Sequence, residues 1–230
     1  MPSTRVCTAC GETGHMKTNK RCPKYSEKDT SKPDIGRILK KKNRTNAEQQ
    51  IVIEYAREHR KVALDHRKAQ MELREKWGEE AGGRLDGFSQ ELSQVILMLI
   101  CNHRLGDMTC RKPESGDLIS DIYESIECKC KTSATNAPGS CGGKQHWHTL
   151  AYLNATRCSE DKYSAWILRI KDTDPRWDQF KRAEKNRGVD LVRPRLDWKK
   201  IEEVFKDDIQ LIYEGSFEGI FADLTPQTVA

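Results

Sequence analysis

The sequence predicts an α/β (α+β) fold in which helices flank a mixed β-sheet, preceded by a small cysteine and histidine module and a long connecting helix. Three observations indicate this architecture. A Cys/His cluster lies within residues 5–25, a run of helix formers without glycine or proline covers 47–77, and strand and helix periodicities follow from residue 85. With 230 residues, the chain has room for one domain of about 150 residues and an appendage.

The apolar content argues against a transmembrane helix, and nothing in the sequence marks the chain for secretion. Apolar residues make up 36% of the chain and charged residues 33%, and the longest apolar run, residues 95–101, has seven residues, whereas a transmembrane helix needs about 20. The first ten residues also lack the apolar segment of a secretory signal. We therefore expect no membrane contact and a reducing compartment, where the nine cysteines act as metal ligands or small buried side chains.

Basic residues are concentrated at the N-terminus. The first 50 residues contain 12 Lys and Arg against 5 Asp and Glu, and the remaining 180 contain 28 against 30. A basic arm is attracted to the phosphates of nucleic acids, although a basic run is also typical of a solvated linker. Charge alone leaves both interpretations open.

Four residues of the N-terminal module have the spacing C-x2-C-x4-H-x6-C. They are Cys7, Cys10, His15 and Cys22. Three thiolates and one imidazole suit tetrahedral zinc, and glycines at positions 11 and 14 allow tight turns between the ligands. Because this segment is too short to form a core, metal binding would supply its folding energy. We predict one structural Zn²⁺ per chain in a module spanning residues 1–25.

The module resembles a CCHC zinc knuckle, and residues 14–23 are especially similar to the knuckle in the largest subunit of the general transcription factor TFIID. The retroviral nucleocapsid pattern has a shorter final gap, so its grip on single-stranded RNA transfers only weakly. Lys17 and Lys20 are candidate phosphate contacts, and the alternative is that they keep a small module soluble. We expect the knuckle either to add affinity for DNA or to recruit a protein partner.

A basic linker and a long helix are expected next. The lysine-rich residues 26–45 have little to bury, and we predict a linker there. Thr45 and Glu48 have capping-box spacing, and a helix or connector is predicted over residues 46–82, ended by glycines. Its apolar positions are sparse, which favours a solvated connector over a dimerising coiled coil.

The globular core is predicted over residues 83–224, followed by a tail at 225–230. Apolar residues recur at helical spacing between positions 88 and 100, which indicates a helix packed against a sheet. Residues 163–170 are typical of a strand, and the apolar pattern at 201–212 predicts a final amphipathic helix.

Residues 122–130 alternate in polarity and predict a strand with two different faces. One face would carry Ile126, Cys128 and Cys130. The other would carry Glu127, Lys129 and Lys131.

Two acids and a lysine in this region form the pattern D-x9-E-x-K, with Asp117, Glu127 and Lys129. Phosphodiester hydrolysis requires a divalent cation, an oriented water and compensation for negative charge, and carboxylates with one lysine supply these. Glu127 and Lys129 would share a strand face about 6.6 Å apart, and the preceding turn can bring Asp117 alongside. The alternative is a salt-bridged strand face without chemistry.

The pattern and its surroundings resemble the PD-(D/E)XK nuclease superfamily, which includes type II restriction endonucleases. The similarity spans roughly residues 83–221, and the segments at 145–147, 152–155, 193–195 and 214–221 look similar to restriction-endonuclease-like proteins of large eukaryotic DNA viruses. Gly116 stands where many relatives carry proline, and the loop at 133–143 differs from their Gly-Pro-Ser-rich loop. The target sequence therefore cannot be carried over.

The resemblance implies that Asp117 and Glu127 bind Mg²⁺, with the carbonyl of Cys128 as a further oxygen ligand. Lys129 would position or deprotonate the attacking water and offset charge on the phosphate. Glu91 would be an additional acidic member that orients the lysine or a second metal. Its alternative is an ordinary exposed carboxylate on a helix.

Further residues are candidate DNA contacts, and the alternative for each is a solvated surface side chain. They are Lys131, Gln145, His146, Arg193 and Arg195. His146 and His148 could also form a second metal site with Cys141, although C-x4-H-x-H lacks a fourth ligand.

These observations together predict a Mg²⁺-dependent endonuclease that hydrolyses double-stranded DNA at a short specific sequence. Because two strands demand two active sites, we expect a homodimer on a palindromic site. We expect it in the cytoplasm or nucleus of an infected cell or packaged in a virion. Two alternatives remain: a noncatalytic DNA- or chromatin-binding protein on a nuclease-like core, and a structure-selective or RNA-directed nuclease.

Overall fold

The computed structural model describes residues 32–78, 80–81, 88–132, 147–180 and 198–222, together with residues 6, 11 and 13. The chain divides into two units, Met1–Asp34 and Ile35–Ala230. In the first unit, Val6 and Thr13 form an isolated antiparallel bridge. Gly11 between them has a φ of 81°, a left-handed conformation that favours glycine and that a tight turn requires.

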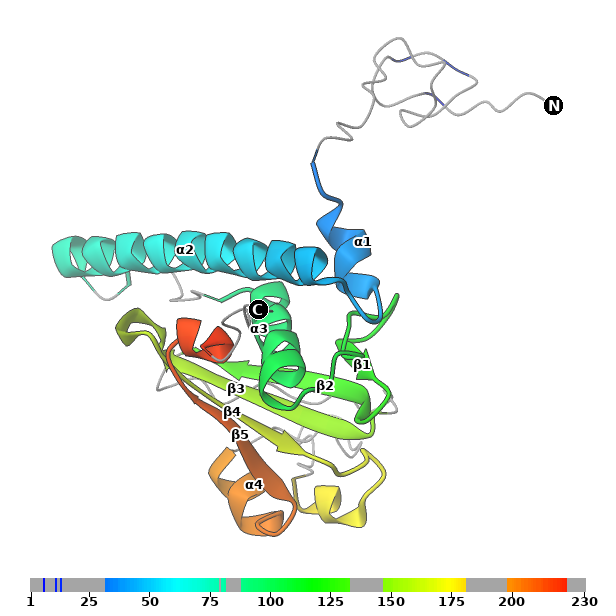
Figure 1. The fold of residues 1–230 in the computed structure, drawn as a ribbon. Coiled ribbons are helices and arrows are strands. Elements are labelled where there is room, and N and C mark those ends of the chain that lie inside the picture. Colours follow the sequence, from blue (N-terminus) through cyan, green and yellow to red (C-terminus); the bar gives the residue numbers. More distant parts are fainter. Residues whose placement is uncertain are drawn as a thin grey trace. The chain divides into compact units, whose positions relative to one another are not determined.

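The second unit is built on a five-stranded sheet whose strands lie in the order β1-β2-β3-β4-β5 (Figure 1). The strands are β1 (Leu118–Ser120), β2 (Glu124–Lys131), β3 (Thr149–Arg157), β4 (Lys162–Leu168) and β5 (Ile209–Gly215). β2 and β3 run parallel and the other neighbouring pairs run antiparallel. The sheet is therefore mixed, as the sequence predicts.

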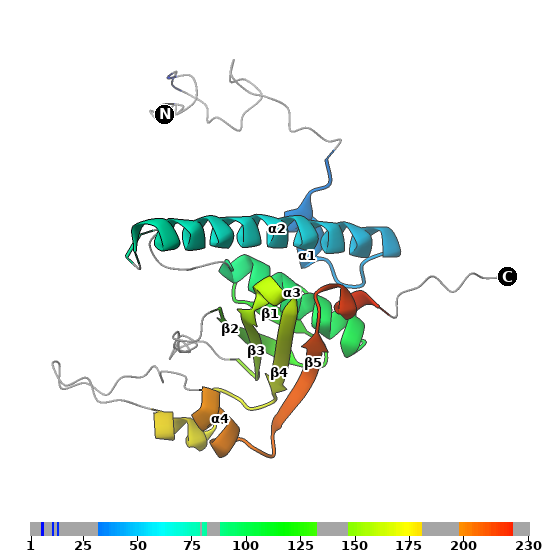
Figure 2. The same cartoon turned by 90° about the vertical axis from the view of Figure 1, so that its left-hand side faces the viewer.

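The helix α3 (Gln90–Arg104) covers one face of this sheet (Figures 1 and 2). The side chain of Ser89 caps its first turn by accepting a hydrogen bond from the backbone N–H of Leu92. Every residue from 92 to 102 is buried. This helix is buried on all sides because the sheet lies against one side and α2 against the other.

The long helix α2 (Asn46–Trp77) begins at the predicted capping box, in which Thr45 and Glu48 each accept from the other's backbone N–H. Its N-terminal half is more than a connector, because Val52, Ile53 and Ala56 are buried in the same core as α3. Farther along, Val62 and Trp77 are exposed, at 65% and 69%.

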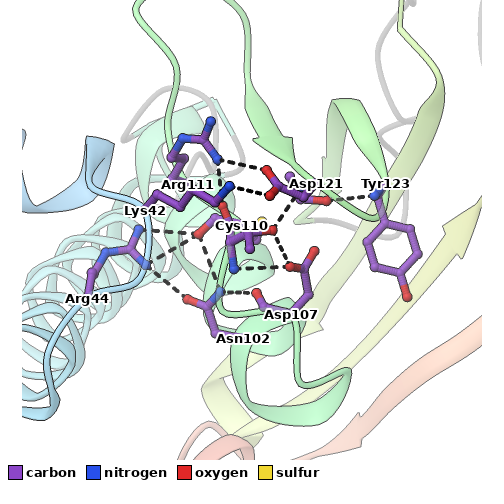
Figure 3. A network of polar contacts seen from close by, with 10 residues as sticks. Lys42, Arg44, Asn102, Asp107, Cys110, Arg111, Asp121 and Tyr123 are labelled. Carbon is purple, nitrogen blue, oxygen red and sulfur yellow. Dashed lines mark hydrogen bonds and ion pairs between the residues drawn. The ribbon is translucent and has the colours of Figure 1, made fainter.

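The linker predicted over residues 26–45 extends too far. Residues Ile35–Lys40 form the helix α1, and Leu39 is buried in the core. Arg44 is only 5% exposed and donates hydrogen bonds to the carbonyls of Leu39 and Cys110 and to Oδ1 of Asn102 (Figure 3). A guanidinium has five donors, so enough acceptors can hold it inside a protein, and the basic composition of the segment concealed this role.

The second face of the sheet carries an aromatic cluster formed with the 3₁₀ helix η2 (Pro175–Phe180) and with α4 (Trp198–Val204). The final helix predicted over 201–212 is wrong in its second half. Helical spacing ends at Phe205, and from Ile209 the chain pairs with β4 as the edge strand β5. Two short 3₁₀ helices, η1 (Cys158–Glu160) and η3 (Glu218–Phe221), complete the described elements.

Five cysteines lie in the described part of the second unit, and all are free thiols: Cys101, Cys110, Cys128, Cys130 and Cys158. Within the same residues, no helix combines the length and apolarity that a bilayer crossing requires.

Candidate active site

The predicted acids meet at the edge of the sheet where β1 begins. Asp117 directly precedes β1, whose Leu118 pairs with Ile126 of β2. One oxygen of Asp117, Oδ2, accepts a hydrogen bond of 2.8 Å from the backbone N–H of Cys128. Asp117 and Glu127 both line a pocket of 310 Å³ at this edge. The structure thus brings together the two carboxylates that the sequence pattern singles out.

Two glutamines of α3 hold the other oxygen of Asp117. Nε2 of Gln94 lies 2.7 Å from Oδ1, and Nε2 of Gln90 lies 3.2 Å from it. The two residues are four apart on the helix and therefore project from the same side. Neither glutamine is predictable as a site residue from the sequence, because a glutamine in a helix carries no catalytic signal of its own.

Lys129 and Glu127 form a nearly buried ion pair on the face of β2 opposite α3. Nζ of Lys129 lies 2.6 Å from Oε1 of Glu127, and their side chains are 16% and 7% exposed. Ile126 and Cys128 belong to the core beneath α3. The predicted alternation of faces along β2 is therefore confirmed for these four residues.

Cys128 takes part in the candidate site through its backbone and not through its thiol. Burial, and then the nearby negative charge of Asp117, raises the pKa of the Cys128 thiol well above its ordinary value. The thiol is therefore neutral near pH 7 and a poor nucleophile. The N–H and C=O of one strand residue point to the same edge, so the Cys128 carbonyl lies on the side of Asp117 and can serve as an oxygen ligand.

Glu91 has a different partner from the one predicted. Its Oε1 accepts a hydrogen bond of 3.2 Å from the hydroxyl of Tyr55 on α2. Burial and the charge of Glu91 raise the pKa of Tyr55 to about 12, so the hydroxyl remains a donor. The structure brings Gln90 and Gln94 of α3, and not Glu91, into contact with Asp117.

Two further residues line the pocket, one at the start of β2 and one in the loop before β3. Ser125 and Trp147 line it together with the acids. Nδ1 of His148 lies 2.9 Å from Oγ of Ser125, and its Nε2 lies 3.1 Å from Oε2 of Glu124. His148 therefore holds the loop end against β2. The other members of the second metal site considered above, Cys141 and His146, lie outside the described residues.

Of the remaining predicted site residues, one lies among the described residues and the others do not. Lys131 is half-buried on the face of β2 that carries Lys129. The other predicted site residues lie outside the described residues: Cys7, Cys10, His15, Cys22, Lys17, Lys20, Gln145, His146, Arg193, Arg195 and Cys141.

The oxygen donors at this edge are of the type that hard cations such as Mg²⁺ take. Across the described ranges, no group of three or more His, Cys, Asp or Glu side chains is placed to hold a metal ion. Two carboxylates and one backbone carbonyl remain. Mg²⁺ takes oxygen ligands and keeps several waters, so one or two carboxylates with substrate oxygens are enough.

Comparison with known proteins identifies the N-terminal module. Residues 5–46 match the zinc knuckle family, so the chain carries a CCHC zinc knuckle, and such a module implies a structural Zn²⁺. Transcription initiation factor TFIID subunit 1 of Oryza sativa subsp. japonica is 58% identical over 36 residues, which are 15% of this chain and 2% of that protein.

Two further TFIID subunits are also similar to this chain over a short segment. Subunit 1b of Arabidopsis thaliana is 62% identical over 29 residues, and subunit 1 of Saccharomyces cerevisiae is 59% identical over 27 residues. These matches cover 13% and 12% of this chain, and it spans only 2% of either relative. No solved structure matches the chain.

Proposed function

We propose that the second unit is a Mg²⁺-dependent endonuclease that hydrolyses phosphodiester bonds of double-stranded DNA. One observation carries this proposal: Asp117 and Glu127 line one pocket, and Lys129 reaches Glu127 there at 2.6 Å. A restriction-endonuclease-like fold is part of the proposal. It is supported by a mixed sheet with a helix behind the acidic strand, although fold likeness alone is an analogy.

The residues of the pocket have separate tasks in this proposal. The carboxylates of Asp117 and Glu127 and the carbonyl of Cys128 would hold the cation, which when bound supplies a Lewis acid that polarises the phosphate. Gln90, Gln94 and the N–H of Cys128 keep Asp117 oriented before substrate arrives. Such preorganisation avoids reorganisation during the reaction.

Lys129 would act on the water and the phosphate. Its ammonium is held by Glu127, which lines the pocket, and is largely shielded from bulk solvent, so its electrostatic interactions are stronger than on an open surface. It can hydrogen-bond the attacking water and offset the negative charge that develops on the phosphate oxygens.

In the same proposal, two copies of the chain act on the two strands of a short specific sequence, and the zinc knuckle adds affinity for DNA or for a protein partner. A homodimer supplies two active sites with the symmetry of a palindrome.

Incubation of the protein with supercoiled plasmid tests the activity. We expect discrete fragments with Mg²⁺ and none when the cation is omitted. Lys129→Met should lower the cleavage rate at least about 100-fold, in line with the loss of a positioned acid-base group. Lys61→Met on the exposed face of α2 is the matched control and should cleave as the wild type does.

A noncatalytic DNA- or chromatin-binding protein is the second candidate, favoured by the likeness of the knuckle to subunits of a transcription initiation factor. It predicts intact plasmid under every metal condition and DNA binding that Lys129→Met does not change. That pair of results would contradict the nuclease proposal. A smear in place of fragments would keep the nuclease and remove its sequence specificity.

A further inference from the structure

A second pocket, of 440 Å³, lies on the sheet face that carries Lys129 and Lys131. Strand register connects the two places. Lys131 of β2 pairs with Asn154 of β3, Asn154 with Ser164 of β4, and Ser164 with Glu214 of β5. Directly paired residues point to the same face of a sheet. A polar row therefore crosses the sheet from β2 and ends in this pocket.

The neighbouring row on the same face is aromatic and forms a wall beside the pocket. Lys129 pairs with Tyr152, and Tyr152 with Trp166. The ring of Trp198 from α4 stacks on Tyr152 with centroids 3.8 Å apart. Farther along the same face of the sheet, η2 and α4 cover its apolar end over Leu150. The polar end remains open as the pocket.

Asn154 presents unused hydrogen-bond donors in the pocket. Its Oδ1 accepts from the backbone N–H of Thr156 at 3.1 Å and from the Thr156 hydroxyl at 2.8 Å. This fixes the amide group and leaves both hydrogens of Nδ2 for another acceptor. No acceptor for them lies among the residues that the structure describes, and Ser164 adds a hydroxyl beside them.

Positive charge exceeds negative charge around the pocket. Arg157 and Lys162 line it, and both pair with the same carboxylate, Glu160. Glu214 lines the opposite side, and Lys131 lies at the β2 end of the polar row. The lining itself thus has two cations and one carboxylate, together with neutral N–H and O–H donors. A phosphodiester, which carries one negative charge and several acceptor oxygens, suits this combination.

We propose that this pocket binds a backbone phosphate of the nucleic acid a few nucleotides from the bond that is cut. Strand geometry puts the Cα atoms of Asn154 and Ser164 about 8 and 12 Å from that of Lys129. Phosphates of one DNA strand follow each other at about 3.4 Å along the axis, so the pocket is about two to four phosphates away. The assignment rests on the proposed function, because it takes Lys129 as the cleavage point.

Two substitutions with opposite expected effects test the pocket. Asn154→Asp keeps the acceptor for Thr156 but replaces both donor hydrogens with negative charge, and it should weaken binding of a labelled 20-base-pair duplex about tenfold. Glu214→Gln removes a carboxylate from the pocket and should strengthen binding. Fluorescence anisotropy of the full-length protein in buffer without added Mg²⁺ measures both, and thermal unfolding confirms that each variant is folded.

Controls separate the pocket from general electrostatics. Glu75→Gln on the exposed part of α2 makes the same charge change as Glu214→Gln and should shift affinity less than about twofold. Lys162→Ala should lower the slope of log affinity against log salt by about 0.9, the value for one lost phosphate contact.

The results also separate this inference from the proposed function. If the wild type cleaves plasmid and the pocket variants bind no differently from Glu75→Gln, the phosphate pocket is wrong and the nuclease stands. If nothing is cleaved but the two variants shift affinity in opposite directions, the nuclease is wrong and the phosphate pocket is supported. Unchanged affinity in both variants would overturn the pocket whether or not cleavage occurs.

Discussion

The pairing of Lys129 with Glu127 places an amine and a carboxylate 2.6 Å apart where water barely reaches. A charge in such a place depends on its partner, because removing one member leaves the other buried and uncompensated. Each residue is therefore important for stability as well as for the proposed chemistry, and loss of activity alone would not separate the two roles.

A double-substitution cycle separates them. Lys129→Met and Glu127→Leu should each lower the free energy of unfolding by about 3 kcal/mol or more, whereas the double variant should recover most of this loss because it leaves no unpaired charge. Urea unfolding measures the stability, and the plasmid cleavage rate should be at least about 100-fold lower in all three variants. A double variant as unstable as the sum of the single ones would contradict the pairing.

Gln94 supports Asp117 through a hydrogen bond and is not itself a proposed metal ligand. Gln94→Leu removes the donor at 2.7 Å and should lower the cleavage rate about tenfold, at a cost in stability of about 1 kcal/mol. The Mg²⁺ concentration for half-maximal cleavage should rise as well, because a less ordered Asp117 holds a cation less well. Gln50→Leu, an exposed change on α2, serves as the control.

Cys130 gives a prediction for high pH. Burial raises the pKa of its thiol from 9.0 to about 12, so above pH 9 the unfolded chain loses a proton that the folded chain keeps. The folded state then binds more protons, and stability must fall as pH rises. Cys130→Ala should make this fall shallower by about 1.4 kcal/mol per pH unit between pH 9 and 12. Urea unfolding across that range measures the slope, and an unchanged slope would contradict the account.

At the scale of elements, the polar network in Figure 3 supports the edge on which the pocket is built. Arg44 bonds the end of α1 to the C-terminal part of α3 and to the carbonyl of Cys110. The next residue, Arg111, exchanges two backbone hydrogen bonds of 2.9 Å with Ile119 of β1. The network therefore holds β1, and with it Asp117, against the helices.

Arg44→Met tests this connection. Burial lowers the pKa of Arg44, and its substitution leaves several buried acceptors without donors. We expect a loss of about 2 to 4 kcal/mol in the free energy of unfolding, because each unsatisfied group costs about 1 to 3 kcal/mol. Lys61→Met, an exposed change on α2, should cost less than about 0.5 kcal/mol. Equal effects of the two changes would show that Arg44 has no special role.

Strong local signals made part of the fold predictable. The capping box of Thr45 and Glu48 fixed the start of α2, and the polarity of residues 126–129 gave the correct faces of β2. The prediction of one final helix was wrong because the apolar spacing at 201–212 fits a helix and a strand equally well. Pairing with β4, a long-range event, decides that Ile209 begins a strand.

The candidate site was predictable only in its charged residues. Asp117, Glu127 and Lys129 follow a pattern that relates directly to metal chemistry. Gln94 and Ser125 have no such pattern, and they enter the site because α3 and the loop before β3 are brought to the same edge. Arg44 was assigned to a linker, since composition does not show that five donors can be satisfied inside a core.

At the scale of the whole molecule, the zinc knuckle and the second unit are separate compact parts of one chain. Cys10→Ser should therefore lower the zinc content below one ion per chain and leave the unfolding transition of the second unit unchanged, because metal binding contributes folding energy only to the knuckle. Elemental analysis and thermal unfolding of the full-length protein measure these two properties. A large drop in the main transition would contradict the separation.

The proposed nuclease activity depends above all on Asp117 and Glu127 holding one divalent cation at the edge of the sheet. Calorimetric titration of the zinc-loaded protein with Mg²⁺ tests this directly, with Asp117→Asn, Glu127→Gln and the exposed control Asp65→Asn measured alongside. We predict one Mg²⁺ site per chain in the wild type and in Asp65→Asn, and at least a tenfold weaker site in the other two variants. Equal Mg²⁺ binding by all four proteins would contradict the account.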